Sequence, residues 1–214
     1  MASFALTISK KMITPANSRA QESNLESDEA LVVRAKAGDR TAFESLFLRH
    51  RDLVYRFSYN MVRKRDDAED IVQDVFVRAY NNLDRYRDEA KFSTWLLRIA
   101  SNLCTDKARM HNRRNTLEQQ EAKGALGWMT ENENEDPIEN LEGDRRIELL
   151  KKALMALPEH HRSMIVMRDI EEKEYSDIAE ICGTTVGGAK LRVLRARRAL
   201  RDRMEPLLKE DENV

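Results

Sequence analysis

The feature that most constrains the fold is the spacing of apolar residues, which recur three and four positions apart along much of the chain. Between residues 41 and 62, for example, they are Phe43, Leu46, Phe47, Val54 and Phe57. This period gathers side chains on one face of an α-helix. Only 7 glycines and 4 prolines punctuate the 214 residues, which is too few for the many turns of an all-β fold. The sequence therefore predicts an all-α protein.

The helical pattern divides the chain into two small helical domains joined by a flexible acidic linker. Residues 1–26 lack sustained periodicity and are rich in Ser, Thr, Asn and Gln, which predicts a mobile tail. The first domain is expected over 27–113, the linker over 114–143 and the second domain over 144–210.

Capping residues mark several of the expected helix ends. Ser27 is placed to cap the first helix and Gly38 to end it, and Ser93 is placed to cap a helix that runs to about Arg109. In the second domain, Pro158 suits the first position of a helix.

Charge is nearly balanced over the whole chain but segregated along it. The formal net charge is -1, while basic residues crowd 98–114 and 190–203 and acidic ones crowd 66–74 and 118–144. Such segregation predicts different surfaces for different partners. Cys104 and Cys182 stand far apart without further metal ligands nearby, so neither a disulfide nor a metal site is expected. With no signal-like start and no apolar run of membrane-spanning length, we expect a cytoplasmic protein without membrane insertion.

The stretch YSDIAEICGTTVGGAKLRV predicts a helix-turn-helix. A short helix with Ile178, Ala179 and Ile181 meets a turn at Gly183, where a positive φ is expected. Thr184 or Thr185 can then cap a second helix.

The second helix separates into an inward and an outward face. The inward residues are Val186, Ala189, Val193, Ala196 and Leu200. The outward residues are Thr184, Gly188, Leu191, Arg192, Arg195 and Arg198, with Lys190 threaded among them. A cationic outer face suits a recognition helix on duplex DNA. The alternative is a solvated helix whose arginines pair with nearby acids, although no Glu lies four residues before them.

Two helices of the first domain carry further candidate surfaces. The helix over 66–83 places Asp66, Asp70, Gln73 and Asp74 opposite its apolar face, which indicates either a docking face for a basic partner or a solvated surface. The next segment combines Phe92 and Trp95 with a positive flank. Its cations are Arg98, Lys107, Arg109, Arg113 and Arg114. Aromatic rings beside cations suit single-stranded nucleic acid, while a place in the core is the other interpretation of Trp95.

Taken together, these segments resemble bacterial sigma factors of the extracytoplasmic-function group. The resemblance rests on DAEDIVQDVFVRAY, FSTWLLRIASNLCTDKAR, LPEHHRSMIVMRDIEEKEYSDIAEICG and VGGAKLRVLRARRALR, and it covers about residues 27–203. It implies that the first domain docks on core RNA polymerase, opens the duplex and reads the minus-ten element, and that the second reads the minus-thirty-five element. A stress or envelope-response regulon and an inhibitory anti-sigma partner are also implied.

The resemblance transfers roles to individual positions. It places Asp70, Gln73 and Asp74 in the polymerase-docking helix, Asn102 and Asp106 at the unpaired minus-ten strand, and Arg192 and Arg195 in the recognition helix. The full set of expected DNA-binding residues is Trp95, Arg98, Asn102, Asp106, Lys107, Arg109, Thr184, Thr185, Gly188, Lys190, Leu191, Arg192 and Arg195.

The recognition helix also departs from the family pattern, which has Thr-Val-Lys-Ser-Arg-Leu after Val-Gly. Here Gly188 stands in place of the hydroxyl-bearing residue, which weakens the helix by about 1 kcal/mol relative to Ala. It leaves room for a close approach of the backbone. Leu191 offers an apolar contact suited to thymine methyl groups.

No catalytic or cofactor-binding pattern accompanies these surfaces. His160 and His161 are adjacent and cannot form a metal pair on one helix face, and no Gly-rich phosphate loop is present. We therefore expect a promoter-specificity subunit, monomeric when free, rather than an enzyme. The competing classes are a repressor or activator that acts without polymerase, and a helical protein-interaction adaptor.

Overall fold

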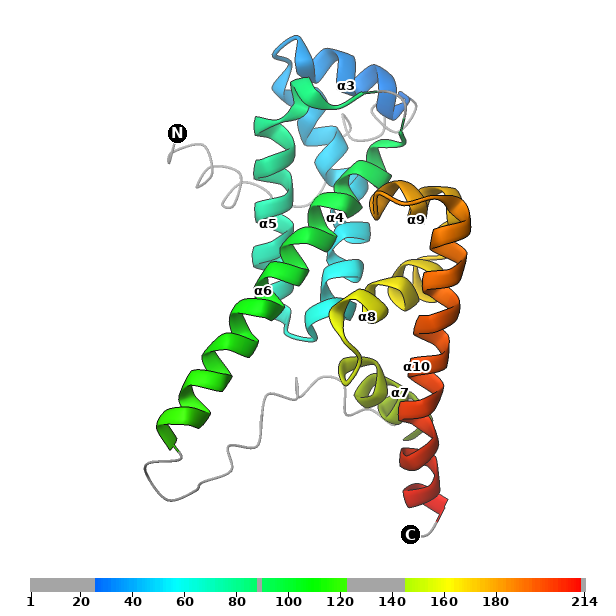
Figure 1. The fold of residues 1–214 in the computed structure, drawn as a ribbon. Helices are drawn as coiled ribbons and strands as arrows, with labels where there is room; N and C mark the ends of the chain where they lie inside the picture. The colour runs from blue at the N-terminus through cyan, green and yellow to red at the C-terminus, as the bar shows by residue number, and fades with distance from the viewer. Residues whose placement is uncertain (1–25, 88–89, 123–144, 213–214) are drawn as a thin grey trace.

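The computed structural model describes residues 26–87, 90–122 and 145–212, and Figure 1 shows their arrangement. Within these ranges the chain is helical and contains no strand, which confirms the expected all-α class. The elements are α3 (Asp28–Lys36), α4 (Arg40–Val62), α5 (Arg65–Asn81), η1 (Leu83–Arg85), α6 (Phe92–Ala122), α7 (Arg145–Met155), α8 (Glu159–Ile165), the π-helical η2 (Val166–Ile170), α9 (Tyr175–Ile181) and α10 (Val186–Glu212). The predicted tail up to residue 25 and the predicted linker from residue 123 lie outside the described residues.

The first two helices begin and end where capping chemistry predicts. The Ser27 hydroxyl accepts a hydrogen bond from the Ala30 amide at 3.3 Å. Gly38 has a φ of 95°, a conformation that glycine adopts without strain. Directly after it, the Asp39 carboxylate accepts from the Thr41 amide at 2.9 Å and caps α4. The turn between α3 and α4 is therefore encoded locally.

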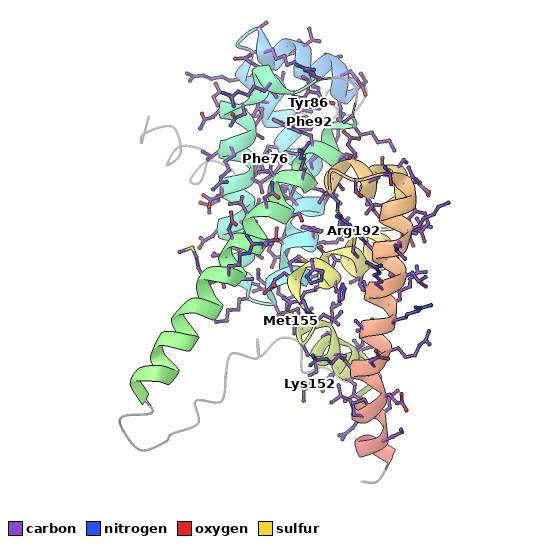
Figure 2. The ribbon with its side chains drawn as sticks, in the orientation of Figure 1. Phe76, Tyr86, Phe92, Lys152, Met155 and Arg192 are labelled. Atoms are coloured by element: carbon purple, nitrogen blue, oxygen red, sulfur yellow. The ribbon has the colours of Figure 1, made fainter. Side chains whose placement is uncertain are left out.

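The core of the first domain forms where α4 packs against α3, α5 and α6. Fully buried side chains include Leu46, Phe57 and Leu96. Near the start of α6, the rings of Tyr86 and Phe92 meet edge to face with centroids 5.5 Å apart, and Figure 2 shows both at the same end of the domain. These contacts pack the start of α6 against the segment that follows η1.

Helix α6 differs from its predicted bounds at both ends. It begins at Phe92, and the Lys91 carbonyl accepts from the amides of Thr94 and Trp95, so Ser93 lies inside the first turn and is not the cap. The helix continues to Ala122, well beyond the expected end near Arg109. Figure 1 shows its C-terminal part extending away from the other helices. Residues 110–122 lack Gly and Pro, so nothing local stops the helix near Arg109.

The second domain is built around α10, which packs against α7, α8 and α9. Pro158 is the residue before α8 rather than its first residue, one position from the prediction. The buried face of α10 includes Ala189, Val193 and Ala196. Figure 1 shows α10 running along one side of the molecule.

The two domains contact each other through a buried arginine. Arg162 of α8 is 7% exposed. Its guanidinium donates hydrogen bonds to the carbonyls of Leu154 at 3.1 Å, Met155 at 2.6 Å and Leu157 at 3.0 Å, within its own domain. It also donates to the Met61 carbonyl at the end of α4, at 2.6 Å. The side chain therefore supplies donors to the C-terminal ends of two helices from different domains.

Two ion pairs lie at the same contact. Arg56 of α4 reaches Glu171 with 3.0 Å between Nη2 and Oε2, and the Glu171 side chain is only 3% exposed. Lys91 reaches Asp177 of α9 at 3.4 Å. Helix α9 lies beside α6, and η2 beside α4. The domains thus form one continuous apolar cluster in this arrangement.

Candidate nucleic-acid interface

The outward face of α5 is acidic and exposed, as the sequence predicts. Asp66, Asp70, Gln73 and Asp74 are exposed, together with Val77 at 40%. The opposite face, with Ile71 and Val75 among others, is buried against the core. A charged stripe beside an exposed valine is a surface that a basic partner with some apolar area can cover.

One of the predicted DNA-binding cations is engaged with this acidic face. Lys107 Nζ lies 2.8 Å from Asp67 Oδ1 and 3.3 Å from Asp70 Oδ2. Burial lowers the pKa of Lys107, but hydrogen bonds and charge from Asp67 and then Asp70 outweigh it and raise the pKa overall. Lys107 therefore links α6 to α5 in this structure. The Asp70 carboxylate takes part in this link, so it is not free of intramolecular partners.

Helix α6 presents a polar stripe at helical spacing. Arg98, Asn102, Asp106 and Arg109 are all exposed. An ion pair of 4.0 Å joins Arg109 Nη1 to Asp106 Oδ1 within the stripe. The stripe carries donors and acceptors in a row, as needed to contact the edges and backbone of an extended strand.

Trp95 lies at the inner end of that stripe and is partly buried. Its ring centroid is 5.2 Å from that of Tyr86 and 5.7 Å from that of Phe92. The indole therefore packs on the aromatic cluster at the start of α6 while part of it stays accessible. This packing fits the core interpretation, and the partial exposure of the side chain still allows an outside contact.

The turn between α9 and α10 has the predicted helix-turn-helix geometry. Gly183 has a φ of 58°, and the Thr184 amide donates to the Ala179 carbonyl at 2.8 Å. The Thr185 hydroxyl accepts from the Gly188 amide at 3.1 Å, so Thr185 caps α10. Ala179 is buried and lets the two helices approach closely.

The outer face of α10 is cationic with apolar patches. Lys190, Leu191, Arg192 and Arg195 are exposed, Leu191 at 46%. Within the described part of the chain, none of these three cations forms an ion pair with a carboxylate. The Lys190 ammonium lies 5.7 Å from the Tyr175 ring centroid, and the Arg192 guanidinium, labelled in Figure 2, lies beside the Cys182 thiol. The face is positively charged and open to solvent.

Three residues of the second domain differ from the sequence analysis or were missed by it. Val186 was expected on the inward face but is 45% exposed, because it is the first residue of α10 and its side chain points back toward the turn. Leu194 joins Leu191 on the outer face at 46% exposure. Leu194 lies three residues after Leu191, and this spacing could have placed it on the same face of the helix. Arg197 forms an ion pair with Asp169 of η2, and the helical spacing of residues in the sequence does not predict this pair.

The described residues include two free cysteines and no metal-binding centre. Among the described residues, no group of His, Cys, Asp or Glu is placed to hold a metal ion. Cys104 is buried, and burial raises the pKa of its thiol to about 12. Cys182 is partly buried, and burial again raises its pKa. Over the same residues, none of the helices combines the length and apolar character that a membrane span needs.

The fold and its surfaces define a helical DNA-binding protein of the helix-turn-helix class, and comparison with known proteins specifies it further. The chain matches Sigma-70 region 2 over residues 46–114 and Sigma-70, region 4 over residues 147–200. ECF RNA polymerase sigma factor SigW of Bacillus subtilis is 34% identical over 183 residues, which cover 82% of this chain and 96% of that protein. ECF RNA polymerase sigma-E factor of Escherichia coli K12 is 32% identical, with 85% and 96% covered.

Solved structures agree with this assignment. CnrH, solved in complex with the cytosolic domain of CnrY, superimposes with a TM-score of 0.60 at 25% identity, covering 87% of this chain and 99% of that chain. The sigma factor RpoE of Bartonella quintana, solved with the anti-sigma factor NepR, gives 0.54 at 26% identity, with 76% and 96% covered. The chain belongs to the sigma-70 family, among its ECF RNA polymerase sigma factors. It directs transcription initiation, and the members of this family are not enzymes.

Proposed function

We propose that the three exposed faces divide the work of initiation, with α5 docking on core RNA polymerase, α6 holding the opened minus-ten strand and α10 reading the minus-thirty-five duplex. The faces lie on different helices and differ in charge: α5 is acidic, α6 mixed and α10 basic. Different partners select different charge patterns, so this segregation supports separate tasks.

The observation that carries the proposal is the outer face of α10. It follows a capped turn with the geometry of a helix-turn-helix, and it exposes Lys190, Arg192 and Arg195. A helix with this exposure and charge fits the major groove, where cations bind phosphates and neighbouring side chains contact base edges.

The stripe on α6 supports the second task. Asn102 can donate and accept hydrogen bonds with a base that has left the duplex, and Arg98 and Arg109 lie one or two helical turns away, where they can follow the strand's backbone. Trp95 contributes the exposed part of its side chain at the inner end. Lys107 acts through the α5 contact rather than on DNA directly.

The residues assigned to docking are Asp70, Gln73 and Asp74 on α5. Their exposure supports this role. Asp74 and Gln73 are the stronger candidates, because Asp70 also interacts with Lys107.

The likeness to solved relatives supports a proposal on regulation and location. Of the solved relatives named above, RpoE was captured with the anti-sigma factor NepR and CnrH with the cytosolic domain of CnrY. We therefore infer that this chain is also held by an anti-sigma factor, acts in the cytoplasm where the chromosome is transcribed, and serves a stress or envelope-response regulon. It contributes recognition and strand opening as a monomer and performs no covalent chemistry.

The test compares Arg195→Ala with Asn102→Ala in holoenzyme reconstituted from the full chain and core polymerase. The arginine change removes a duplex contact, so it should weaken binding to an upstream-element duplex and reduce the salt dependence of that binding. The asparagine change should leave duplex binding intact and lower the fraction of promoters that become permanganate-reactive, which reports opened thymines. Equal losses of duplex binding in both variants, with no specific opening defect, would contradict the division of tasks.

A further inference from the structure

The two threonines before α10 have different surroundings. The Thr185 hydroxyl is occupied by the Gly188 amide and completes the helix cap. The Thr184 hydroxyl has no hydrogen-bond partner within the part of the chain that the structure describes, and the residue is only partly buried. The Thr185 hydroxyl therefore stabilises the helix start, and the Thr184 hydroxyl is available to a ligand.

Gly188 provides the space in which the Thr184 side chain lies. A Cβ placed at Gly188 would come within 2.5 Å of Thr184 Oγ1, a separation that real Cβ atoms do not show, and would also lie 3.3 Å from Thr185 Oγ1 and 3.7 Å from Thr184 Cβ. The sequence alone suggests that Gly188 leaves room for another backbone to approach. In the structure that room is filled from within the chain by Thr184.

The neighbouring glycine has no such contact. A Cβ at Gly187 would meet only Thr185 Oγ1, at 4.0 Å, which is ordinary van der Waals contact. The close fit is therefore particular to Gly188, where Thr184 Oγ1 is the nearest atom and the capping Thr185 Oγ1 the next, and it does not arise merely from glycines in the first turn of a helix.

The backbone of Thr184 is also fixed. Its amide donates to the Ala179 carbonyl, and Gly183 before it adopts the left-handed conformation of the turn. With the backbone held, rotation about the Cα–Cβ bond is the remaining freedom of the side chain, and three staggered positions are available to it. A methyl group at residue 188 would remove the position that the hydroxyl occupies.

We propose that Gly188 is a positioning residue for DNA recognition, and that it sets specificity by letting the Thr184 hydroxyl lie across the first turn of α10, where it contacts the upstream promoter element. This inference rests on the proposed reading of duplex DNA by α10. The family pattern has threonine where this chain has Gly188. Under this inference, that difference helps to determine which DNA sequence is preferred. It also predicts that the two residues act as one unit.

The experiment is a double-mutant cycle on sequence preference. Holoenzyme containing the full chain is offered duplexes with a randomised upstream element and a constant downstream part, and the enrichment of each base is measured for the wild type, Thr184→Ala, Gly188→Ala and the double variant. Gly187→Ala, alone and combined with Thr184→Ala, is the matched control, since it makes the same chemical change one residue away. Arg195→Ala serves as the reference for loss of duplex binding.

The expected result is that Thr184→Ala and Gly188→Ala reduce the preference at the same base step about five- to tenfold, as is typical of one lost polar contact. The double variant should be no worse than either single change by more than about twofold. Alanine favours helix more than glycine does, so a lower melting temperature in Gly188→Ala would assign its effect to disturbance of the Thr185 cap and count against the inference. Any effect of Gly187→Ala should be unchanged when Thr184 is also replaced.

Two outcomes would overturn the inference while leaving the proposed function in place. Additive losses from Thr184→Ala and Gly188→Ala would show that the residues act separately. Unchanged preferences in both variants, with duplex binding lost in Arg195→Ala, would show that Thr184 does not contribute to recognition. If Arg195→Ala also left duplex binding unchanged, the assignment of α10 as the recognition helix would itself be wrong.

Discussion

At the residue scale, Asp39 shows how a single charge stabilises the start of a helix. Its carboxylate accepts hydrogen bonds from the Thr41 hydroxyl and amide and pairs with Arg34. The bond from the Thr41 side chain, followed by that from Arg34, lowers the pKa of Asp39 from 3.8 to about 2. The folded protein therefore binds this proton less readily than the unfolded chain does.

We predict that Asp39→Asn lowers the melting temperature at neutral pH, because asparagine keeps a cap but loses the charge. The contribution of a carboxyl group with a depressed pKa is fully present above its unfolded value near 3.8 and disappears as the pH falls toward about 2. Melting curves of both proteins between pH 7 and pH 2 should therefore converge at the acidic end. If the difference in melting temperature between the two proteins stayed constant with pH, the effect would come from the geometry of the cap and not from its charge.

Single residues also show where sequence reasoning succeeds and where it stops. Ser27, Gly38 and Gly183 were predicted correctly because caps and turns depend on neighbours a few positions away. Val186 was placed on the wrong face because a helical wheel treats the first residue of a helix like any other. The space beside Gly188 could not be predicted at all, since it depends on the rotamer of Thr184.

At the scale of elements, α5 and α6 are coupled by Lys107, and this changes how the docking face should be tested. Charge reversal at Asp70 would place a second cation beside Lys107 and disturb the contact between the helices. Asp74 is exposed on the same face. It forms no ion pair within the described residues. It therefore reports on docking without this complication.

We predict that Asp74→Lys weakens binding to core polymerase about fivefold or more at moderate salt, as expected for a charge at a complementary interface. Helix content should stay the same, because the side chain points away from the core. The matched control is Glu44→Lys, an equal charge reversal at an exposed position on α4. Binding can be measured by competition for core polymerase, and equal affinities for the two variants would remove α5 from the docking surface.

The sequence predicted where the helices lie, but it did not predict where α6 ends or how α6 contacts α5. Periodicity identified each helix, because apolar faces must be buried. The end of α6 was misjudged because charged and polar residues continue a helix as readily as they form a linker. The pairing of Lys107 with Asp67 and Asp70 joins residues about forty positions apart, so it becomes visible only once α5 and α6 are packed.

At the scale of the whole molecule, the two domains are in direct contact, which no pattern in the sequence indicates. Arg162 donates to backbone carbonyls, which every residue has. Its partners therefore cannot be predicted from residue types in the sequence. The two promoter elements, by their names, lie about 25 base pairs apart, or roughly 85 Å of duplex at about 3.4 Å per base pair. If the two domains read these elements as proposed, they must separate to span that length, so we expect the contact between Arg162 and Met61 to open on the promoter.

We predict that Arg56→Glu opens the contact in the free protein, because Glu171 is almost fully buried and would face a second carboxylate. Small-angle scattering should then give a larger radius of gyration than for the wild type. The exchange variant Arg56→Glu with Glu171→Arg should restore the compact value. Arg51→Glu, the same change on α4 beside the exposed Asp52, is the control. A compact Arg56→Glu variant would show that this ion pair does not hold the domains together.

The central claim is that this chain gives core RNA polymerase its choice of promoter, and a reconstituted transcription reaction tests it directly. Genomic fragments that carry start sites induced by overproduction of the chain serve as templates for purified core polymerase, with and without the full-length protein. The account predicts transcripts of defined length only when the chain is present, and their loss in a variant carrying both Asp74→Lys and Arg195→Ala although that protein is folded. Equal transcription with and without the chain, or initiation spread over many sites, would contradict it.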